Sequence, residues 1–224
     1  MAELASLVRL LQLASPSLPV GAYSYSQGME AAVDAGIVRD ASSARDWIGD
    51  VLELAAAPME GALLLRLAQA WAAGDAARAA RWNEELLASR ETSELRAESV
   101  QMGQSLRRLV QELGLDPAGA LAAIEEPAFV TSYAFAAVAW DIPAAQALAA
   151  WLFGWIENQV LAAVKAVPLG QTDAQRMLLA LGSRIPREVE RACRMPDDAI
   201  ANLAPGLALL CARHETQYTR LFRS

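Results

Sequence analysis

The chain has 224 residues, 54% of them hydrophobic and 20% charged, a balance that is typical of a globular protein and excludes a long disordered region. Its net charge of −7 argues against nucleic-acid binding, because an acidic surface repels phosphates. No apolar run reaches the roughly 18 to 20 residues of a membrane span, and the N-terminus lacks a signal-peptide pattern. We therefore expect a cytoplasmic protein without a membrane segment.

Apolar residues recur at helical spacing along almost the whole chain, and β-branched residues are sparse. The pattern predicts an all-α fold, a single-domain helical bundle of about ten helices over residues 1–224. The first helix carries an apolar stripe and stops at Ser15-Pro16. Its stripe consists of Leu4, Leu7, Val8 and Leu11. A second helix runs from about Gly28 to Ala35, with Ser24 or Ser26 as cap and Gly36 as its end.

The middle of the chain is divided by Pro58, Gly74 and Gly114. The predicted helices are 43–57, 59–73, 75–87, 89–113, 128–140, 143–167, 173–183 and 198–214, with irregular chain around Pro186 and Pro196. Ser43 with Asp46 resembles a capping box, and Thr172 or Asp173 is expected to cap the helix after Pro168. In the predicted helix 89–113, Gly103 lies beside an apolar stripe and would permit close approach of another segment.

Side chains suited to catalysis or metal binding are few. The chain has one histidine and two cysteines, and it lacks the glycine-rich loop that binds nucleotide phosphates. Cys211 and His214 are three residues apart, which we interpret as a buried cysteine beside a surface histidine; a weak metal site shared across a dimer is the alternative. We expect no enzymatic activity, no bound metal and no cofactor.

Lys165 is the only lysine, against eighteen arginines. It lies in the last turn of a predicted helix, seven residues after Asn158 and on the same face. A cation there favours the helix dipole, but arginine would serve that purpose equally well. A compact ammonium group is therefore interpreted as part of a docking surface for a carboxylate or phosphate.

Two further segments carry features that packing alone does not explain. In Leu18-Pro19-Val20-Gly21-Ala22-Tyr23-Ser24-Tyr25-Ser26-Gln27-Gly28, two tyrosines flank small polar residues at a helix entrance, where rings with hydroxyl tips favour recognition. The ending His214-Glu215-Thr216-Gln217-Tyr218-Thr219-Arg220-Leu221-Phe222-Arg223-Ser224 alternates cationic and bulky apolar groups. Such a tail is expected to dock, either on its own domain or on another chain.

Taken together, these segments resemble the urease accessory protein UreF family. The shared motifs, in the family's order, are Leu-Pro-Val-Gly-x-Tyr-Ser-Tyr-Ser-x-Gly, Lys-x-Val-Pro-Leu-Gly-Gln and His-Glu-Thr-Gln-Tyr-x-Arg-Leu-Phe-Arg-Ser. The helix start at Arg90-Glu91-Thr92-Ser93 is also family-like, so the resemblance covers nearly the whole chain. Met29 and Ala174 depart from the usual residues, and the region 115–147 matches only loosely.

The resemblance implies an adaptor for urease maturation. Such a protein dimerises and binds the accessory protein UreD, also called UreH, together with the GTPase UreG and apo-urease. Nickel and GTP are carried by the GTPase, and the complex gates GTP-dependent nickel insertion through a protected passage.

Motif matching assigns residues to two docking surfaces. The GTPase-facing residues are Tyr23, Glu30, Asp34, Lys165, Gln171 and Asp173. The UreD-facing residues are Arg220, Leu221 and Phe222, within a partner-docking tail over 215–224. The alternatives are a helical interaction domain unrelated to nickel and, third, a helical enzyme with a shallow site near Lys165.

Overall fold

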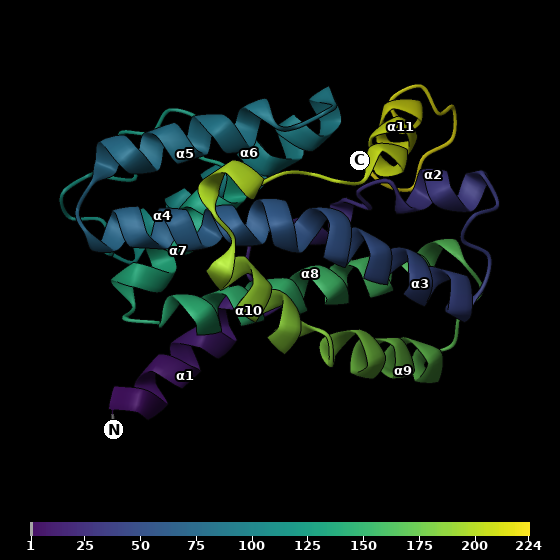
Figure 1. Ribbon diagram of the computed structural model, residues 1–224, viewed down its shortest axis with the longest axis horizontal. Coiled ribbons are helices and arrows are strands. Elements are labelled where there is room, and N and C mark those ends of the chain that lie inside the picture. The colour runs from purple at the N-terminus through teal and green to yellow at the C-terminus, as the bar shows by residue number, and fades with distance from the viewer. Residues whose placement is uncertain (1) are drawn as a thin grey trace.

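The computed structural model describes residues 2–224 and confirms the all-α prediction, since no strand occurs within that range (Figure 1). The α-helices are α1 (Ala2–Leu13), α2 (Met29–Asp34), α3 (Ala41–Val51), α4 (Ala62–Ala72), α5 (Ala76–Ala88), α6 (Ser93–Glu112), α7 (Phe129–Ala139), α8 (Ala144–Ala166), α9 (Gln171–Gly182), α10 (Ile185–Arg194) and α11 (Pro205–His214). Short 3₁₀ turns occur at η1 (Ala22–Ser24) and η3 (Asp197–Ala199). The segment η2 (Leu52–Gly61) is wound as a π-helix.

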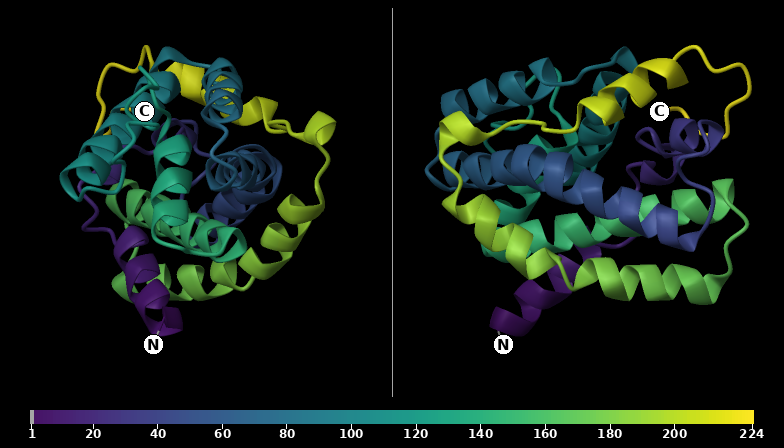
Figure 2. Two further views of the ribbon diagram at one scale, coloured as in Figure 1. Left: turned by 90° about the vertical axis from the view of Figure 1, so that its left-hand side faces the viewer. Right: turned by 45° about the vertical axis from the view of Figure 1, so that its right-hand side comes forward.

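Helix α8 forms the centre of the body. Leu148, Leu152 and Ile156 are completely buried, and the helix packs against α1, α2, α3, α4, α7, α9, α10 and η2 (Figure 2). By length and composition α8 alone among the described helices could cross a membrane, a feature that the search for apolar runs missed. Neighbouring helices cover it from several sides, which is the environment of a core helix.

The predicted break at Pro58 is wrong. Helices α3, η2 and α4 follow one another without interruption from Ala41 to Ala72, and Pro58 is buried inside η2. Proline has no backbone N–H and its ring collides with a carbonyl of the preceding turn. The wider π-helical winding provides room for the ring, so the chain continues as one long rod.

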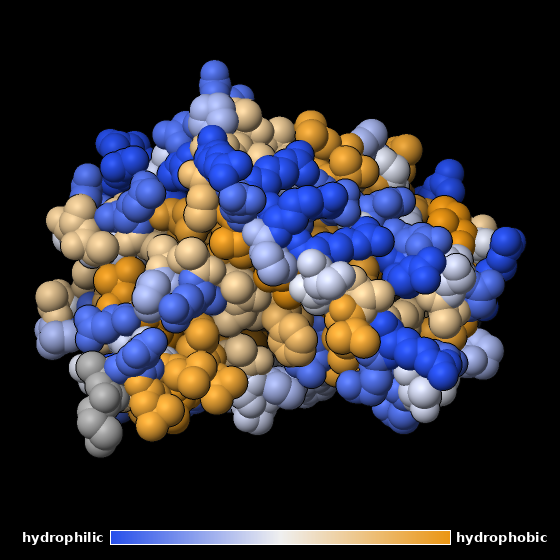
Figure 3. Space-filling view, turned by 60° about the horizontal axis from the view of Figure 1, so that its bottom comes forward, coloured by the Kyte–Doolittle hydropathy of each residue, from blue (hydrophilic) through white to orange (hydrophobic). Residues whose placement is uncertain are grey.

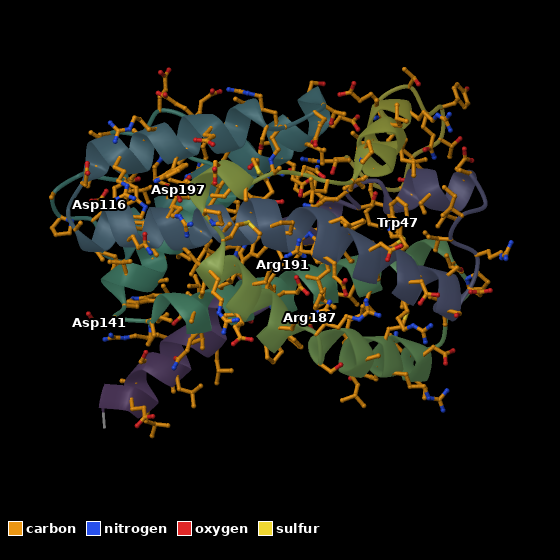
Figure 4. All side chains as sticks on the ribbon, viewed as in Figure 1. Trp47, Asp116, Asp141, Arg187, Arg191 and Asp197 are labelled. Carbon is orange, nitrogen blue, oxygen red and sulfur yellow. The ribbon has the colours of Figure 1, made fainter. Side chains whose placement is uncertain are left out.

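The expectation of irregular chain around Pro186 is also wrong, because α10 runs through it. Proline is tolerated there since it lies in the first turn, where the N–H has no helical partner. Figure 4 labels Arg187 and Arg191 on this helix. Arg187 lies 2.5 Å from the Glu53 carboxylate and Arg191 donates to the Glu53 carbonyl at 3.0 Å, so α10 is fastened to η2.

Several helix ends differ from their predicted positions. The capping box before α3 is Asp40 with Ser43, rather than Ser43 with Asp46. Helix α9 begins at Gln171 without a side-chain cap, and α11 begins only at Pro205. Thr92 caps α6, because its hydroxyl accepts from the Leu95 N–H at 3.2 Å. Only α3 and α6 of these helices therefore have a side-chain cap.

The apolar stripe of α1 faces solvent. Leu4, Leu7, Val8 and Leu11 are between 48% and 62% exposed. Figure 3 shows hydrophobic side chains gathered at the corner of the molecule that α1 forms. In Figure 1 helix α1 lies at the lower left, whereas the chain ends in the upper part of the view beside α11 and α2.

Candidate functional site

The loop between α1 and α2 forms the floor of the candidate site. Gly21 and Gly28 adopt left-handed backbone conformations, with φ of +77° and +84°. At Gly28 a side chain would meet Cys211 Sγ at 3.0 Å, so glycine lets α11 approach the start of α2 closely. Gln27 is also left-handed, with φ of +50°. These conformations turn the loop so that its backbone groups face both α8 and the end of the chain.

Lys165 lies where this loop, α8 and the tail meet. Its Nζ donates to the Tyr23 carbonyl at 3.4 Å and lies 5.9 Å from the centre of the Tyr23 ring. It also lies 5.4 Å from the centre of the Phe222 ring. Asn158, seven residues before Lys165 on α8, donates to the Tyr25 carbonyl at 3.1 Å. The predicted shared face of Asn158 and Lys165 is therefore confirmed, and the ammonium group lies near two aromatic rings.

The C-terminal tail folds back onto this loop and onto α2, next to which the chain ends in Figure 1. The Glu30 carboxylate accepts the Leu221 N–H at 2.7 Å and the Phe222 N–H at 3.0 Å. Arg223 N–H donates to the Ser24 carbonyl, and the Ser224 carbonyl accepts from the N–H groups of both Ser26 and Gln27. Phe222 is 6% exposed, whereas Leu221 is 69% exposed. Phe222 is thus the anchor of the tail, and the Leu221 side chain points outward.

A histidine lies buried beneath the tail. His214 is 0% exposed, with Nδ1 2.7 Å from a Glu94 oxygen and Nε2 3.2 Å from a Glu30 oxygen. Arg220 pairs with the same Glu94 carboxylate. The interpretation of His214 as a surface histidine is wrong, because α11 turns this residue inward against α2 and α6. Its neighbour Cys211 is buried as predicted, and burial raises the pKa of the thiol to about 12.

Glu98 of α6 contacts Ser224, the last residue of the tail. Its carboxyl group accepts from Gln27 Nε2 and from Ser224 Oγ, both at 2.6 Å. Burial raises the pKa of this carboxyl to about 7, against the opposing effect of these two hydrogen bonds. Gln27 in turn accepts from Trp155 Nε1 at 2.7 Å. This chain of hydrogen bonds connects the tail to α6 and α8.

A cavity of about 130 Å³ lies beside this network, between the α1–α2 loop, α6 and α8. Its walls include the apolar side chains of Leu18, Met102 and Trp151, and Gln27 and Glu98 form part of its polar side. Tyr133 also lines it, and its buried hydroxyl has no hydrogen-bond partner within the described chain. Among residues 2–224, no group of three or more His, Cys, Asp or Glu side chains is placed to hold a metal ion.

The structure brings most, though not all, of the predicted site residues together. Tyr23, Glu30 and Lys165 adjoin Arg220, Leu221 and Phe222, so these parts of the two predicted surfaces form one continuous site. Within it Glu30 is buried under the tail.

The remaining predicted residues lie outside this contact network. Asp34 is exposed at the end of α2, and Gln171 is exposed at the start of α9. Asp173 pairs with Arg176 at 3.2 Å rather than with a group of the tail site.

Sequence reasoning missed Gln27, Glu94, Glu98, His214 and Ser224 as members of the site. All but Glu98 lie within or next to the quoted motifs, and Glu98 lies one helical turn after Glu94. Nothing in their spacing indicates that residues 26–30, 94–98 and 214–224 meet, because these segments are far apart along the chain. The lone histidine at the start of the C-terminal motif was the available signal.

The fold and the site define a class of protein: an all-helical protein whose candidate site is built from a loop, a helix end and a folded-back tail. The chain belongs to the UreF family, and a sequence profile of that family matches residues 38–182. The curated urease accessory protein UreF of Azoarcus sp. (strain BH72) is 59% identical to it, over 97% of this chain and 95% of the relative. UreF of Dechloromonas aromatica (strain RCB) is 51% identical, over 97% of both chains. UreF of Janthinobacterium sp. (strain Marseille) is 49% identical, over 98% of both. These relatives are named as accessory proteins and not as enzymes.

Proposed function

We propose that this chain is a non-catalytic cytoplasmic adaptor of urease maturation, which bridges UreD (UreH) and the GTPase UreG so that GTP-dependent nickel insertion into apo-urease is gated. Membership of the UreF family supports the link to urease. The observation that carries the adaptor role is the position of Lys165 next to the rings of both Tyr23 and Phe222. One exposed cation thus adjoins both proposed docking surfaces.

In this proposal the UreG-facing surface consists of exposed groups. Tyr23 is 68% exposed, and Asp34, Lys165 and Gln171 are exposed as well. Asp173 extends this surface along α9. Glu30 contributes indirectly, because its carboxylate holds the tail and is itself covered. The compact ammonium group of Lys165 suits a carboxylate or phosphate of the GTPase.

The UreD-facing surface is the tail, residues 215–224. Leu221 and Tyr218 present exposed side chains there, while Phe222 anchors the segment. An apolar side chain held outward by main-chain hydrogen bonds is preorganised for docking, which lowers the entropic cost of binding. The chain acts as one domain and as a homodimer within the complex, and nickel and GTP are carried by UreG.

The test is copurification from cells that express the chain with UreD and UreG. The affinity tag belongs before α1, because α1 lies away from the tail (Figure 1). Lys165→Ala should reduce UreG recovery about tenfold, because a desolvated cation–π or charged contact is worth about 1 to 2 kcal/mol. The matched control is Arg108→Ala, which removes an exposed cation from α6 and should leave recovery unchanged.

Lys165→Arg tests whether UreG requires a compact ammonium group or accepts any cation at this position. If UreG requires the compact ammonium, arginine should restore recovery only partly; if any cation suffices, it should restore recovery fully. Undiminished UreG recovery by Lys165→Ala would refute the assignment of this residue.

A further inference from the structure

Four ionisable side chains form a compact cluster beneath the tail: Glu30 of α2, Glu94 of α6, His214 of α11 and Arg220 of the tail. His214 is completely buried and Glu30 is 6% exposed. Both ring nitrogens of His214 contact a carboxylate oxygen, at 2.7 Å for Glu94 and 3.2 Å for Glu30. Buried charges are stable only when they are paired and hydrogen-bonded, so the protonation state of the cluster matters.

With both carboxylates ionised, the hydrogen-bond geometry limits the protonation state of the ring. An ionised carboxylate only accepts hydrogen bonds, and a neutral imidazole has a single N–H. With a neutral ring, one of the two contacts would place a nitrogen lone pair against a carboxylate oxygen. Both contacts are hydrogen bonds when the ring is an imidazolium, with one N–H for each carboxylate. The cluster then contains two negative charges, on Glu30 and Glu94, and two positive charges, on His214 and Arg220, and is neutral.

Other charged groups lie around this cluster. Glu215 accepts from Ser93 Oγ at 2.6 Å and from the Glu94 N–H at 3.2 Å. Glu98 lies one turn further along α6 and is bonded to Ser224 and Gln27. Arg90 pairs with Glu60 at 2.8 Å and donates to Ser99. Each of these groups has its own partner, which leaves His214 as the group that neutralises the carboxylate pair together with Arg220.

The same carboxylates hold the tail. The Glu30 oxygen that contacts His214 Nε2 also accepts the Phe222 N–H, and the other Glu30 oxygen accepts the Leu221 N–H. One oxygen of Glu94 contacts His214 and the other pairs with Arg220. The imidazole therefore fixes the orientation of both carboxylates that receive residues 220–222.

We propose that His214, as an imidazolium, is the positioning residue of the tail: it holds Glu30 and Glu94 in the orientation that receives Arg220, Leu221 and Phe222. The inference rests on the proposed function only where it takes the tail as the UreD-docking surface. Docking of the tail on its own chain is measurable without any partner.

The experiment measures hydrogen exchange of the Leu221 and Phe222 amides by NMR in the full-length chain. His214→Gln removes the charge but retains a side chain that donates hydrogen bonds, and leaves the cluster with a net charge of −1. Exchange of both amides should accelerate about tenfold or more, because an uncompensated buried charge weakens the docked state. Arg213→Gln is the matched control: it removes an exposed cation from the same helical turn and should leave the rates unchanged.

The double variant His214→Gln/Glu94→Gln separates charge from shape. Its cluster is neutral again but also lacks the Glu94–Arg220 ion pair, so exchange should be slower than in His214→Gln without returning fully to the wild-type rate. If His214 matters only for its shape, the double variant will exchange at least as fast as His214→Gln, and the proposal fails. It also fails if His214→Gln leaves both rates unchanged.

Global unfolding is recognised from the amides of α8, which should keep their protection in every variant. If His214→Gln exposes α8 as well, the ring nitrogen-15 shifts of His214 in the wild-type chain decide the question. Two protonated ring nitrogens support the proposal, and the pattern of a neutral tautomer overturns it. None of these measurements uses UreD or UreG, so failure here is distinct from failure of the adaptor role.

Discussion

Glu98 shows how burial changes the chemistry of a single residue. Its side chain is enclosed between α6, the loop before α2 and Ser224, and desolvation raises the pKa of its carboxyl to about 7 from the ordinary 4.5. The folded chain therefore binds this proton more tightly than the unfolded chain does. The contribution of Glu98 to the free energy of unfolding is greatest below about pH 4.5 and falls as the pH rises to about 7.

The size of this effect gives a prediction. Between about pH 5 and pH 8 the wild-type chain should lose up to about 3 kcal/mol of stability through Glu98. Glu98→Gln does not titrate, so urea unfolding of the variant should show a smaller loss over the same range. The difference between the two chains cancels the contribution of all other groups. A difference that stays constant with pH would mean that Glu98 is ionised throughout.

Lys165 shows what residue-level reasoning could anticipate. The composition singled it out, and helical spacing aligned it with Asn158, as the structure confirms. The contact of Lys165 with the Phe222 ring was not predictable, because Lys165 and Phe222 are 57 positions apart in the sequence. The same limit applies to His214, whose burial depends on where α11 packs.

At the scale of elements, Gly103 determines how α6 meets the chain that enters α7. A Cβ at this position would lie 1.9 Å from the Pro127 carbonyl oxygen, which is backbone and cannot easily move. Gly103→Ala should therefore lower the free energy of unfolding by about 3 kcal/mol through overpacking. The matched control is Gly182→Ala in α9, where no heavy atom lies within 4 Å of the added carbon.

The control should leave stability unchanged or raise it by up to about 1 kcal/mol, because alanine is the better helix former. Urea unfolding of both variants checks the pair. Equal effects at the two positions would contradict the close approach at Gly103, which the sequence pattern had indicated and the structure confirms.

Helix boundaries were less predictable than helix existence. Pro58 and Pro186 both suggested breaks, yet one is absorbed in the π-helical segment η2 and the other lies in the first turn of α10. Local rules state what proline disfavours. They do not state how far the packing of α3, α4 and α10 around it compensates that cost.

At the scale of the whole molecule, the tail joins segments that are distant in sequence, and its two apolar residues have different surroundings. Phe222→Ala should lower the free energy of unfolding by about 3 kcal/mol, since it empties a buried position. Leu221→Ser should change stability by less than about 0.5 kcal/mol, because the side chain is 69% exposed. In the copurification assay Leu221→Ser should nevertheless reduce UreD recovery. Undiminished recovery with Leu221→Ser would place UreD elsewhere on the surface.

By itself the sequence determined the helical class, most of the helices and the family resemblance, because helical periodicity and short motifs are local properties. It also identified Tyr23, Lys165 and the tail as candidates. Only the tertiary structure decided that the loop, the end of α8 and the tail form one site, that Glu30 lies beneath that tail, and that His214 is enclosed between two carboxylates. Contacts between residues 30, 94, 165, 214 and 222 depend on how α2, α6, α8 and α11 pack, and no spacing along the chain encodes that packing.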